Sequence, residues 1–267
     1  MKQLLPLILI ALVIPACENV TDFSDEWYQQ YKGSTSIDSD INFNPVEVYN
    51  SGEVVPPILK LQFFTTKSYG CINYRINTTQ FENKDELILR FDKVEIGPVC
   101  LTAIGPAYTS ILLPEKTKYV VLINGDKIDE YEVTIDEEKV YFSPKTVSFS
   151  NLKHRQTFRY PKDSFALLCG TNVDNTHLCG DFYTLLTDST NVSEFTFEGD
   201  GIIPYPDSTS GNWRNNPATF FTYSSFEEYL RAGDLLKSFS EKNLTENDGV
   251  TIYMSSWNNK HFRSWMF

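Results

Sequence analysis

The residues best suited to catalysis in this chain are carboxylates, because the other common catalytic groups are scarce. There are only three histidines, and no two of them have the spacing of metal ligands. The sequence contains no HExxH, no Cys-x-x-Cys, no Gly-x-Ser-x-Gly and no glycine-rich phosphate loop. We therefore expect neither a bound metal nor a cofactor. His261 is expected to be a solvated surface residue.

Four acids lie close together in the C-terminal half. A pair of carboxylates held at a fixed separation in a cleft can hydrolyse a glycosidic bond. Acids on a solvated strand face are the simpler interpretation, since charged side chains are mostly exposed. The chain is thus expected to bind rather than to catalyse, and hydrolysis of an envelope polysaccharide or peptidoglycan is the alternative. The four acids are Glu194, Glu198, Asp200 and Asp207.

Aromatic residues beside polar ones form the second candidate for chemistry. Trp213 ends a loop rich in Gly, Pro and Ser, and Trp257 and Trp265 lie near the end of the chain. Aromatic rings stack on the apolar faces of sugars, while Asn, Asp and Arg hydrogen-bond to the hydroxyls. Alternatively, the same rings fill a hydrophobic core. The candidate ligand-binding residues are Tyr205, Trp213, Arg214, Trp257 and Asn258.

The N-terminus has the order of a secretory signal peptide. Lys2 provides a positive charge, an apolar run extends from Leu4 to Ile14, and the small residue Ala16 follows. This run is shorter than the roughly 20 residues that a membrane span needs. We expect the chain to be exported.

The residues Ile14-Pro15-Ala16-Cys17 resemble the lipobox of bacterial lipoproteins, in which an aliphatic, a variable and a small residue precede a cysteine. The resemblance implies cleavage of residues 1–16 and diacylation of the Cys17 thiol, which anchors the protein to a membrane. It also implies a location in the bacterial cell envelope, with the outer membrane or the cell surface favoured.

Lipidation of Cys17 accounts for the odd number of cysteines. The chain has five, so four remain in an oxidising compartment and can form two disulfides. Four cysteines allow three connectivities, and proximity in the sequence favours Cys71–Cys100 and Cys169–Cys179.

The sequence predicts a mainly β protein with three mature segments. Residues 17–55 are polar and acidic, which is typical of a solvated tether. Residues 56–145 alternate apolar and polar side chains in about seven short strands, with a hairpin at Asn124-Gly125, which favours an antiparallel immunoglobulin-like or fibronectin-like β-sandwich.

Residues 146–267 are rich in aromatics and predict a smaller α+β domain. Ser164–Cys169 and Asp181–Leu186 are predicted to be strands, so that the second disulfide would close a hairpin. A helix is predicted to begin at Ser224, with Glu227 completing a capping box.

The formal net charge of −12 argues against nucleic acid as a partner, because nucleic acid requires a basic surface. The leading hypothesis is a lipid-anchored binding protein whose ligand is a surface glycan or another envelope protein. The alternatives are the hydrolase and a structural subunit of a surface assembly.

Overall fold

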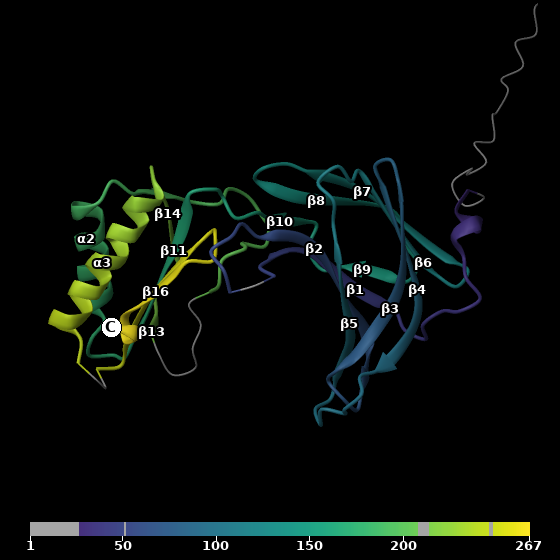
Figure 1. Ribbon diagram of the computed structural model, residues 1–267, viewed down its shortest axis with the longest axis horizontal. Coiled ribbons are helices and arrows are strands. Elements are labelled where there is room, and N and C mark those ends of the chain that lie inside the picture. The colour runs from purple at the N-terminus through teal and green to yellow at the C-terminus, as the bar shows by residue number, and fades with distance from the viewer. Residues whose placement is uncertain (1–26, 51, 208–213, 246–247) are drawn as a thin grey trace, which may run out of the picture.

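The computed structural model describes residues 27–50, 52–207, 214–245 and 248–267. They form a ten-stranded sheet and a six-stranded sheet, which lie beside each other along the long axis of the molecule (Figure 1). The prediction of a mainly β protein with helices in its C-terminal part is confirmed. The signal peptide, Cys17 and Trp213 lie outside the described residues.

The first sheet has the strand order β10-β8-β7-β6-β4-β3-β5-β2-β1-β9. Strands β2 to β8 correspond to the strands predicted between residues 56 and 145, and β1, β9 and β10 extend the sheet beyond that range. The bounds are β1 Ile41–Val48, β2 Ile58–Tyr69, β3 Tyr74–Asn83, β4 Glu86–Ile96, β5 Gly105–Leu112, β6 Tyr119–Asn124, β7 Lys127–Ile135, β8 Lys139–Thr146, β9 Ser150–Leu152 and β10 Gln156–Phe158.

The first sheet curls around its larger core, and a smaller apolar cluster that includes Tyr28 packs on its opposite face. Its two outermost strands, β9 and β10, are consecutive in the sequence, so the ends of the sheet come close together. Phe43 of β1 therefore reaches both Phe63 of β2 and Phe142 of β8, with ring centroids 5.5 Å and 5.7 Å apart. The sheet is mixed, in contrast to the antiparallel arrangement that the sequence predicts, because β4 pairs with β6, β3 with β5, and β1 with β9 in parallel.

Part of the segment predicted to be a tether is folded. Strand β1 lies within residues 17–55 and is antiparallel to β2 along its whole length. Upstream of it, Tyr28 is buried and its hydroxyl donates to Glu86 over 3.0 Å. The side chain of Asn124 binds both the N–H and the C=O of Ile37, at 2.9 Å and 3.1 Å. The tether prediction is wrong for this part because alternating apolar side chains of β1 fill the core.

The predicted hairpin at Asn124-Gly125 is shifted by one residue. The hairpin between β6 and β7 is confirmed, but its two turn residues are Gly125 and Asp126, because Asn124 is still paired with Lys127. Gly125 has a φ of +61°, a conformation that glycine adopts without steric cost.

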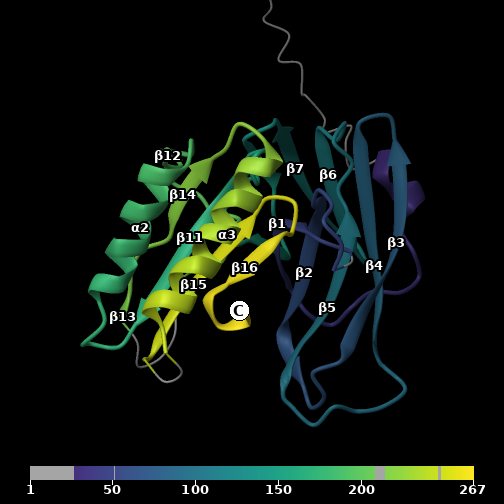
Figure 2. The same cartoon turned by 60° about the vertical axis from the view of Figure 1, so that its left-hand side comes forward.

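The second sheet has the order β12-β14-β11-β15-β16, with β13 also paired to β11. Helices α2 and α3 lie together against one face of it (Figure 2). The bounds are β11 Ser164–Thr171, α2 His177–Ser189, β12 Ser193–Phe195, β13 Arg214–Asn215, β14 Thr219–Thr222, α3 Phe226–Asn243, β15 Val250–Ser256, β16 His261–Arg263 and the 3₁₀ helix η2 Ser264–Met266.

Residues Asp181–Leu186, predicted to be a strand, belong to helix α2. Leu178, Phe182 and Leu186 recur every four residues and are buried against the sheet and α3, so the helical spacing determines the structure. Both predicted disulfides are present, with Cα–Cα distances of 5.4 Å for Cys71–Cys100 and 5.9 Å for Cys169–Cys179. The second one ties β11 to the first turn of α2 and does not close a hairpin.

Helix α3 is confirmed, with its N-cap one residue later than predicted. Ser225 is the N-cap, and its hydroxyl accepts from the backbone N–H of Glu228. In the middle of the helix, a Cβ on Gly233 would lie 2.4 Å from the ring of Phe262 in β16. The absence of a side chain at Gly233 therefore lets the β15–β16 hairpin pack directly on the helix.

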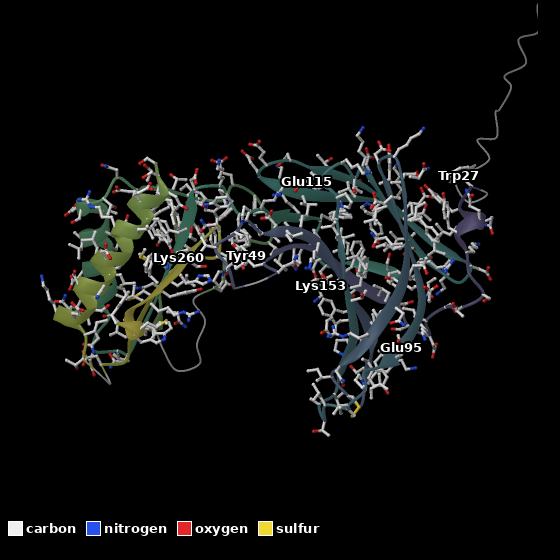
Figure 3. The ribbon with its side chains drawn as sticks, viewed as in Figure 1. Trp27, Tyr49, Glu95, Glu115, Lys153 and Lys260 are labelled. Atoms are coloured by element: carbon white, nitrogen blue, oxygen red, sulfur yellow. A yellow bond between two sulfur atoms is a disulfide. The ribbon has the colours of Figure 1, made fainter. Side chains whose placement is uncertain are left out.

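A polar and aromatic junction joins the two sheets. Where the chain leaves the first sheet, the buried carboxylate of Glu47 accepts from Arg159 Nε at 2.9 Å and from the backbone N–H of Tyr160 at 2.7 Å. Tyr49, which Figure 3 shows beside Lys260, donates from its hydroxyl to the carbonyl of Trp257 over 2.6 Å. The junction thus fixes the C-terminal hairpin against the N-terminal sheet.

Candidate functional site on the helix-free face of the C-terminal sheet

The six-stranded sheet has two unlike faces. Along β11, Leu167 points toward α2 and α3, whereas Ala166 and Leu168 point to the face that carries no helix. In β15 the same alternation directs Ile252 to the helices and Tyr253 to the helix-free face. This second face gathers aromatic side chains that have polar tips.

Tyr205 occupies the inner part of the helix-free face. Its ring is 4.8 Å from that of Tyr160 and 5.6 Å from that of Phe220, and its hydroxyl is 2.6 Å from Ser164 Oγ. The side chain is only 3% exposed, and this burial raises its pKa well above the ordinary value for tyrosine. Tyr205, predicted to bind ligand, is therefore a core residue that covers the sheet.

The other described residues predicted to bind ligand do not converge on one site. Trp257 packs against the helix-side core and donates from its indole N–H to the Tyr223 hydroxyl over 2.9 Å. Asn258 follows it in the hairpin turn, and its buried Oδ1 has no hydrogen-bond partner among the described residues. Arg214 is exposed in β13, where it pairs with Thr171 at the far end of β11.

The outer part of the helix-free face carries four side chains that do converge. We call Tyr253, His261, Arg263 and Trp265 the C-terminal aromatic patch. The guanidinium carbon of Arg263 lies 5.4 Å from the ring centroid of Tyr253 and 5.9 Å from that of Trp265. The two rings are 6.5 Å apart, and the hydroxyl of Tyr253 is 2.9 Å from His261 Nδ1. Trp265 is 56% exposed, so its ring is open to solvent.

The patch is positioned by backbone register and by one buried serine. Tyr253 and Arg263 are directly opposite each other in the β15–β16 pair, which places both on the same face of the sheet. The side chain of Ser264 is buried and accepts from the N–H of Ile252 at 3.0 Å. This bond attaches η2 to β15 and thereby fixes the position of Trp265 within that short helix.

The electrostatics keep the histidine of the patch neutral. Burial lowers the pKa of His261 from its ordinary value of 6.5, and the positive charges of Arg263 and Lys260 lower it further. His261 Nε2 lies 3.0 Å from Asn259 Oδ1. A neutral imidazole with its proton on Nε2 donates to Asn259 and accepts from the Tyr253 hydroxyl, so both contacts are satisfied.

Arg263 brings a positive charge to the surface of an acidic protein. Within the described residues it forms no ion pair with a carboxylate, and its nearest side-chain partner is the sulfur of Met266 at 3.7 Å. The N–H groups that do not contact Met266 are thus available to an acceptor on a ligand.

A hollow of about 820 Å³ lies next to the patch, between the end of α3 and the C-terminal residues. Trp265 is part of the patch and also lines the hollow. Inside, the carboxylate of Asp248 accepts from the N–H and the hydroxyl of Thr245, which lowers its pKa. The hollow adds polar and apolar surface to the patch; its other lining residues are Ser240, Glu241, Leu244, Gly249, Val250, Ser264 and Phe267.

Sequence reasoning missed Tyr253, His261 and Arg263 as members of a site. The sequence pattern that could have indicated them is the alternation in β15 and β16. It places Met254 and Phe262 on the apolar side of the sheet, and Tyr253 and Arg263 on the other side. A single sequence does not indicate which of the two faces the helices cover.

The acids suggested for hydrolysis do not form a catalytic pair. All four are exposed, and Glu194 accepts a hydrogen bond from the hydroxyl of Tyr183 at 2.6 Å. Glycoside hydrolysis needs two carboxyls held in a cleft, with one of them in an environment that keeps it protonated. The described positions of Glu194, Glu198, Asp200 and Asp207 are on the solvated surface.

Three further observations concern metal ligands, membrane-spanning helices and relatives of this chain. Within the described ranges no group of three or more His, Cys, Asp or Glu side chains could hold a metal ion. In the same part of the chain, no helix has the length and apolar character needed to cross a membrane. Comparison with family models, with curated proteins and with solved structures finds no match for this chain.

Proposed function

We propose that this protein is a lipid-anchored binding protein of the bacterial cell envelope that recognises a glycan through the C-terminal aromatic patch. The observation that carries the proposal is the exposed ring of Trp265 beside the cation of Arg263, which has no carboxylate partner among the described residues. Cys17 provides the anchor in this proposal. The curled first sheet serves as an immunoglobulin-like or fibronectin-like spacer between the anchor and the patch.

The patch offers the two kinds of contact that sugar binding needs. The ring of Trp265 can stack on the apolar C–H face of a pyranose, and Arg263 can donate to ring hydroxyls or to a carboxylate on the sugar. Neighbouring sugars of a polymer would extend into the adjacent hollow. The groups of the patch are held by backbone register and by the Ser264 contact, so little side-chain freedom is lost on binding.

The two alternatives have less support. For the hydrolase, the four acids suggested from the sequence, Glu194, Glu198, Asp200 and Asp207, are all exposed. A structural subunit that extends a sheet needs a long open edge, and the edge strands of both sheets, β9 and β10 in the first and β12 and β16 in the second, each have three residues.

The test uses the chain from Glu18 onward, which keeps every described residue. It is incubated with envelope polysaccharides, dietary polysaccharides and peptidoglycan, and both retention on the polymer and release of soluble fragments are measured. We expect retention without release. The Trp265→Ala variant should weaken retention by up to about tenfold, since stacking on an aromatic ring contributes roughly 0.5–1.5 kcal/mol.

Trp27→Ala is the matched control, because Trp27 is similarly exposed, at 51%, and lies at the opposite end of the molecule (Figure 3). Its retention should equal that of the parent chain. Equal retention by the Trp265→Ala variant would exclude the patch as the site, and release of fragments would favour the hydrolase.

A further inference from the structure

The second feature that the fold leaves exposed is an apolar tip on the first sheet. Strands β3, β4 and β5 extend to the lower edge of the molecule in Figure 1, and Figure 3 shows Glu95 near this end. Beyond it lie five exposed apolar side chains, which we call the apolar tip. They are 43–80% exposed and comprise Ile72, Ile96, Val99, Leu101 and Ile104.

The apolar tip is one rigid surface, although its residues come from the end of β4 and from two loops. The Cys71–Cys100 disulfide joins the loops, and the N–H of Ile72 donates to the carbonyl of Leu101 over 3.2 Å. The side chain of Asn73 adds two bonds, donating to the carbonyl of Val99 and accepting from the N–H of Leu101. The tip is thus held in its exposed form before any partner is present.

Charged residues are absent from the tip despite the charge of −12 on the chain. No Asp, Glu, Lys or Arg occurs between Lys67 and Arg75, or between Glu95 and Glu115. Just behind the apolar residues, the rings of Tyr69 and Tyr74 stack with their centroids 4.7 Å apart. Charged groups follow only after this tyrosine pair.

From these observations we propose that the apolar tip inserts into the interfacial region of a phospholipid bilayer. The order from tip to base is apolar, then tyrosine, then charged, which matches the order from acyl chains to headgroups to water. Internal pairing of tip backbone groups by Asn73 and Ile72 fits the same partner, since lipid offers no hydrogen bonds to them. This inference does not depend on glycan binding at the patch.

The charged groups at the base predict how insertion responds to salt. Lys67 pairs with Asp38 at 3.1 Å and Lys93 with Glu95 at 2.6 Å, while Arg75 stacks 3.6 Å from the ring centroid of Tyr108. The base is therefore close to neutral, and attraction to anionic lipid is weak. Binding should depend on apolar burial and change little with ionic strength.

The test again uses the chain from Glu18 onward, so that no acyl group is attached. Co-sedimentation is measured with vesicles of phosphatidylcholine, and separately with vesicles that also contain phosphatidylglycerol. We expect binding to both, unchanged at high salt. The double variant Val99→Asp/Ile104→Asp should reduce binding by at least about tenfold, because two charges would have to enter the interface.

The matched control is Val54→Asp/Val173→Asp, which places two acids at exposed apolar positions away from the tip and should bind as the parent does. Val173 of the control variant is 64% exposed and Val99 of the tip variant is 66% exposed. Replacing either residue by Asp therefore does not disturb a core. Insertion is also read directly from an Ile104→Trp variant, whose added fluorescence should be quenched by lipids brominated on their acyl chains.

Three results would overturn the proposal. The first is that the parent chain does not bind vesicles. The second is that the tip variant binds as well as the parent. The third is that binding requires anionic lipid and disappears at high salt. Self-association of the parent that the tip variant abolishes, without vesicle binding, would assign the surface to a second copy of the chain instead.

Discussion

The two sheets of this protein bury their aromatic residues by different means. The first sheet curls until its ends come close together, so Phe43, Phe63 and Phe142 face one another inside it. The second sheet stays open and uses two helices to cover one face, which leaves the rings of Tyr253 and Trp265 on the other side. The curled sheet thus packs its own rings against one another, whereas the open sheet keeps an aromatic face.

Each sheet consequently offers a different kind of contact surface. The first sheet offers the apolar tip, which lacks charge and hydrogen-bonding side chains apart from those used internally. The second offers the C-terminal aromatic patch, where rings stand beside a cation and a neutral histidine. Variants that act on one sheet at a time test whether the two surfaces are independent.

The largest expected effect comes from removing the disulfides one at a time. The double variant Cys71→Ala/Cys100→Ala opens a sequence separation of 29, and loop entropy predicts a loss of about 3.6 kcal/mol in the free energy of unfolding of the first sheet. Cys169→Ala/Cys179→Ala opens a separation of 10 and should cost the second sheet about 2.7 kcal/mol. Hydrogen exchange resolved along the chain measures each sheet separately.

In each double variant, the protection of the other sheet against hydrogen exchange should stay at the level of the parent chain. Equal loss in both sheets would mean that the junction makes them unfold as one unit, and the comparison between two independent regions would then fail.

A smaller effect is expected from Gly233→Ala. Alanine in the middle of a helix normally stabilises it, but here the added Cβ would overlap the ring of Phe262. Overpacking of this kind costs about 1–3 kcal/mol, and displacement of β16 should also weaken ligand retention at the patch. Chemical denaturation checks the first effect and the polymer assay the second.

Phe262→Leu in the Gly233→Ala background is the companion variant, because the smaller side chain makes room for the new methyl group. Partial recovery of stability is expected. If Gly233→Ala alone stabilises the protein, the hairpin does not depend on this close contact.

The smallest effect concerns His261 and pH. Because its pKa is lowered in the folded state, its contribution to stability is complete above about pH 6.5 and is lost as the pH falls through the lowered value. Protonation would also place a third positive charge beside Arg263 and Lys260 and break the bond that Nδ1 accepts from Tyr253. We expect a small fall in Tm on acidification that the His261→Gln variant does not show.

The Tm of the parent and of the His261→Gln variant is measured by thermal unfolding above and below about pH 6.5. His154→Gln is the matched control, since His154 is an exposed histidine of the first sheet and should leave the pH dependence unchanged. An identical pH dependence in the parent and the His261→Gln variant would show that the charge of His261 does not affect the patch.

The comparison also explains how much could be predicted from the sequence. Alternation over two residues is local information, so the sequence predicts the strands between residues 56 and 145; in β2 the alternating Leu59, Leu61 and Phe63 are all buried. Helix α3 and both disulfides were predicted for the same reason, since caps and short cysteine separations are local. The parallel pairing of β4 with β6 was not predicted, because it is specified only by the core that both strands share.

The candidate site was harder to predict than the fold. Trp257 and Trp265 are eight positions apart and look alike in sequence, yet one hydrogen-bonds to Tyr223 at the core and the other is exposed. Which tryptophan faces solvent depends on the register of the β15–β16 hairpin and on the Ser264 bond to β15. Those contacts are tertiary, and composition does not reveal them.

The junction has a consequence for the order in which the molecule is completed. The Tyr49 bond to Trp257 connects residues 208 positions apart, and the Asn259 amide reaches the carbonyl of Glu53 across 206 positions. A chain that emerges from its N-terminus can complete the first sheet once β10 has appeared, but it cannot make these two bonds between the sheets until Trp257 and Asn259 have emerged. Docking of the two sheets is therefore a late event in folding during synthesis.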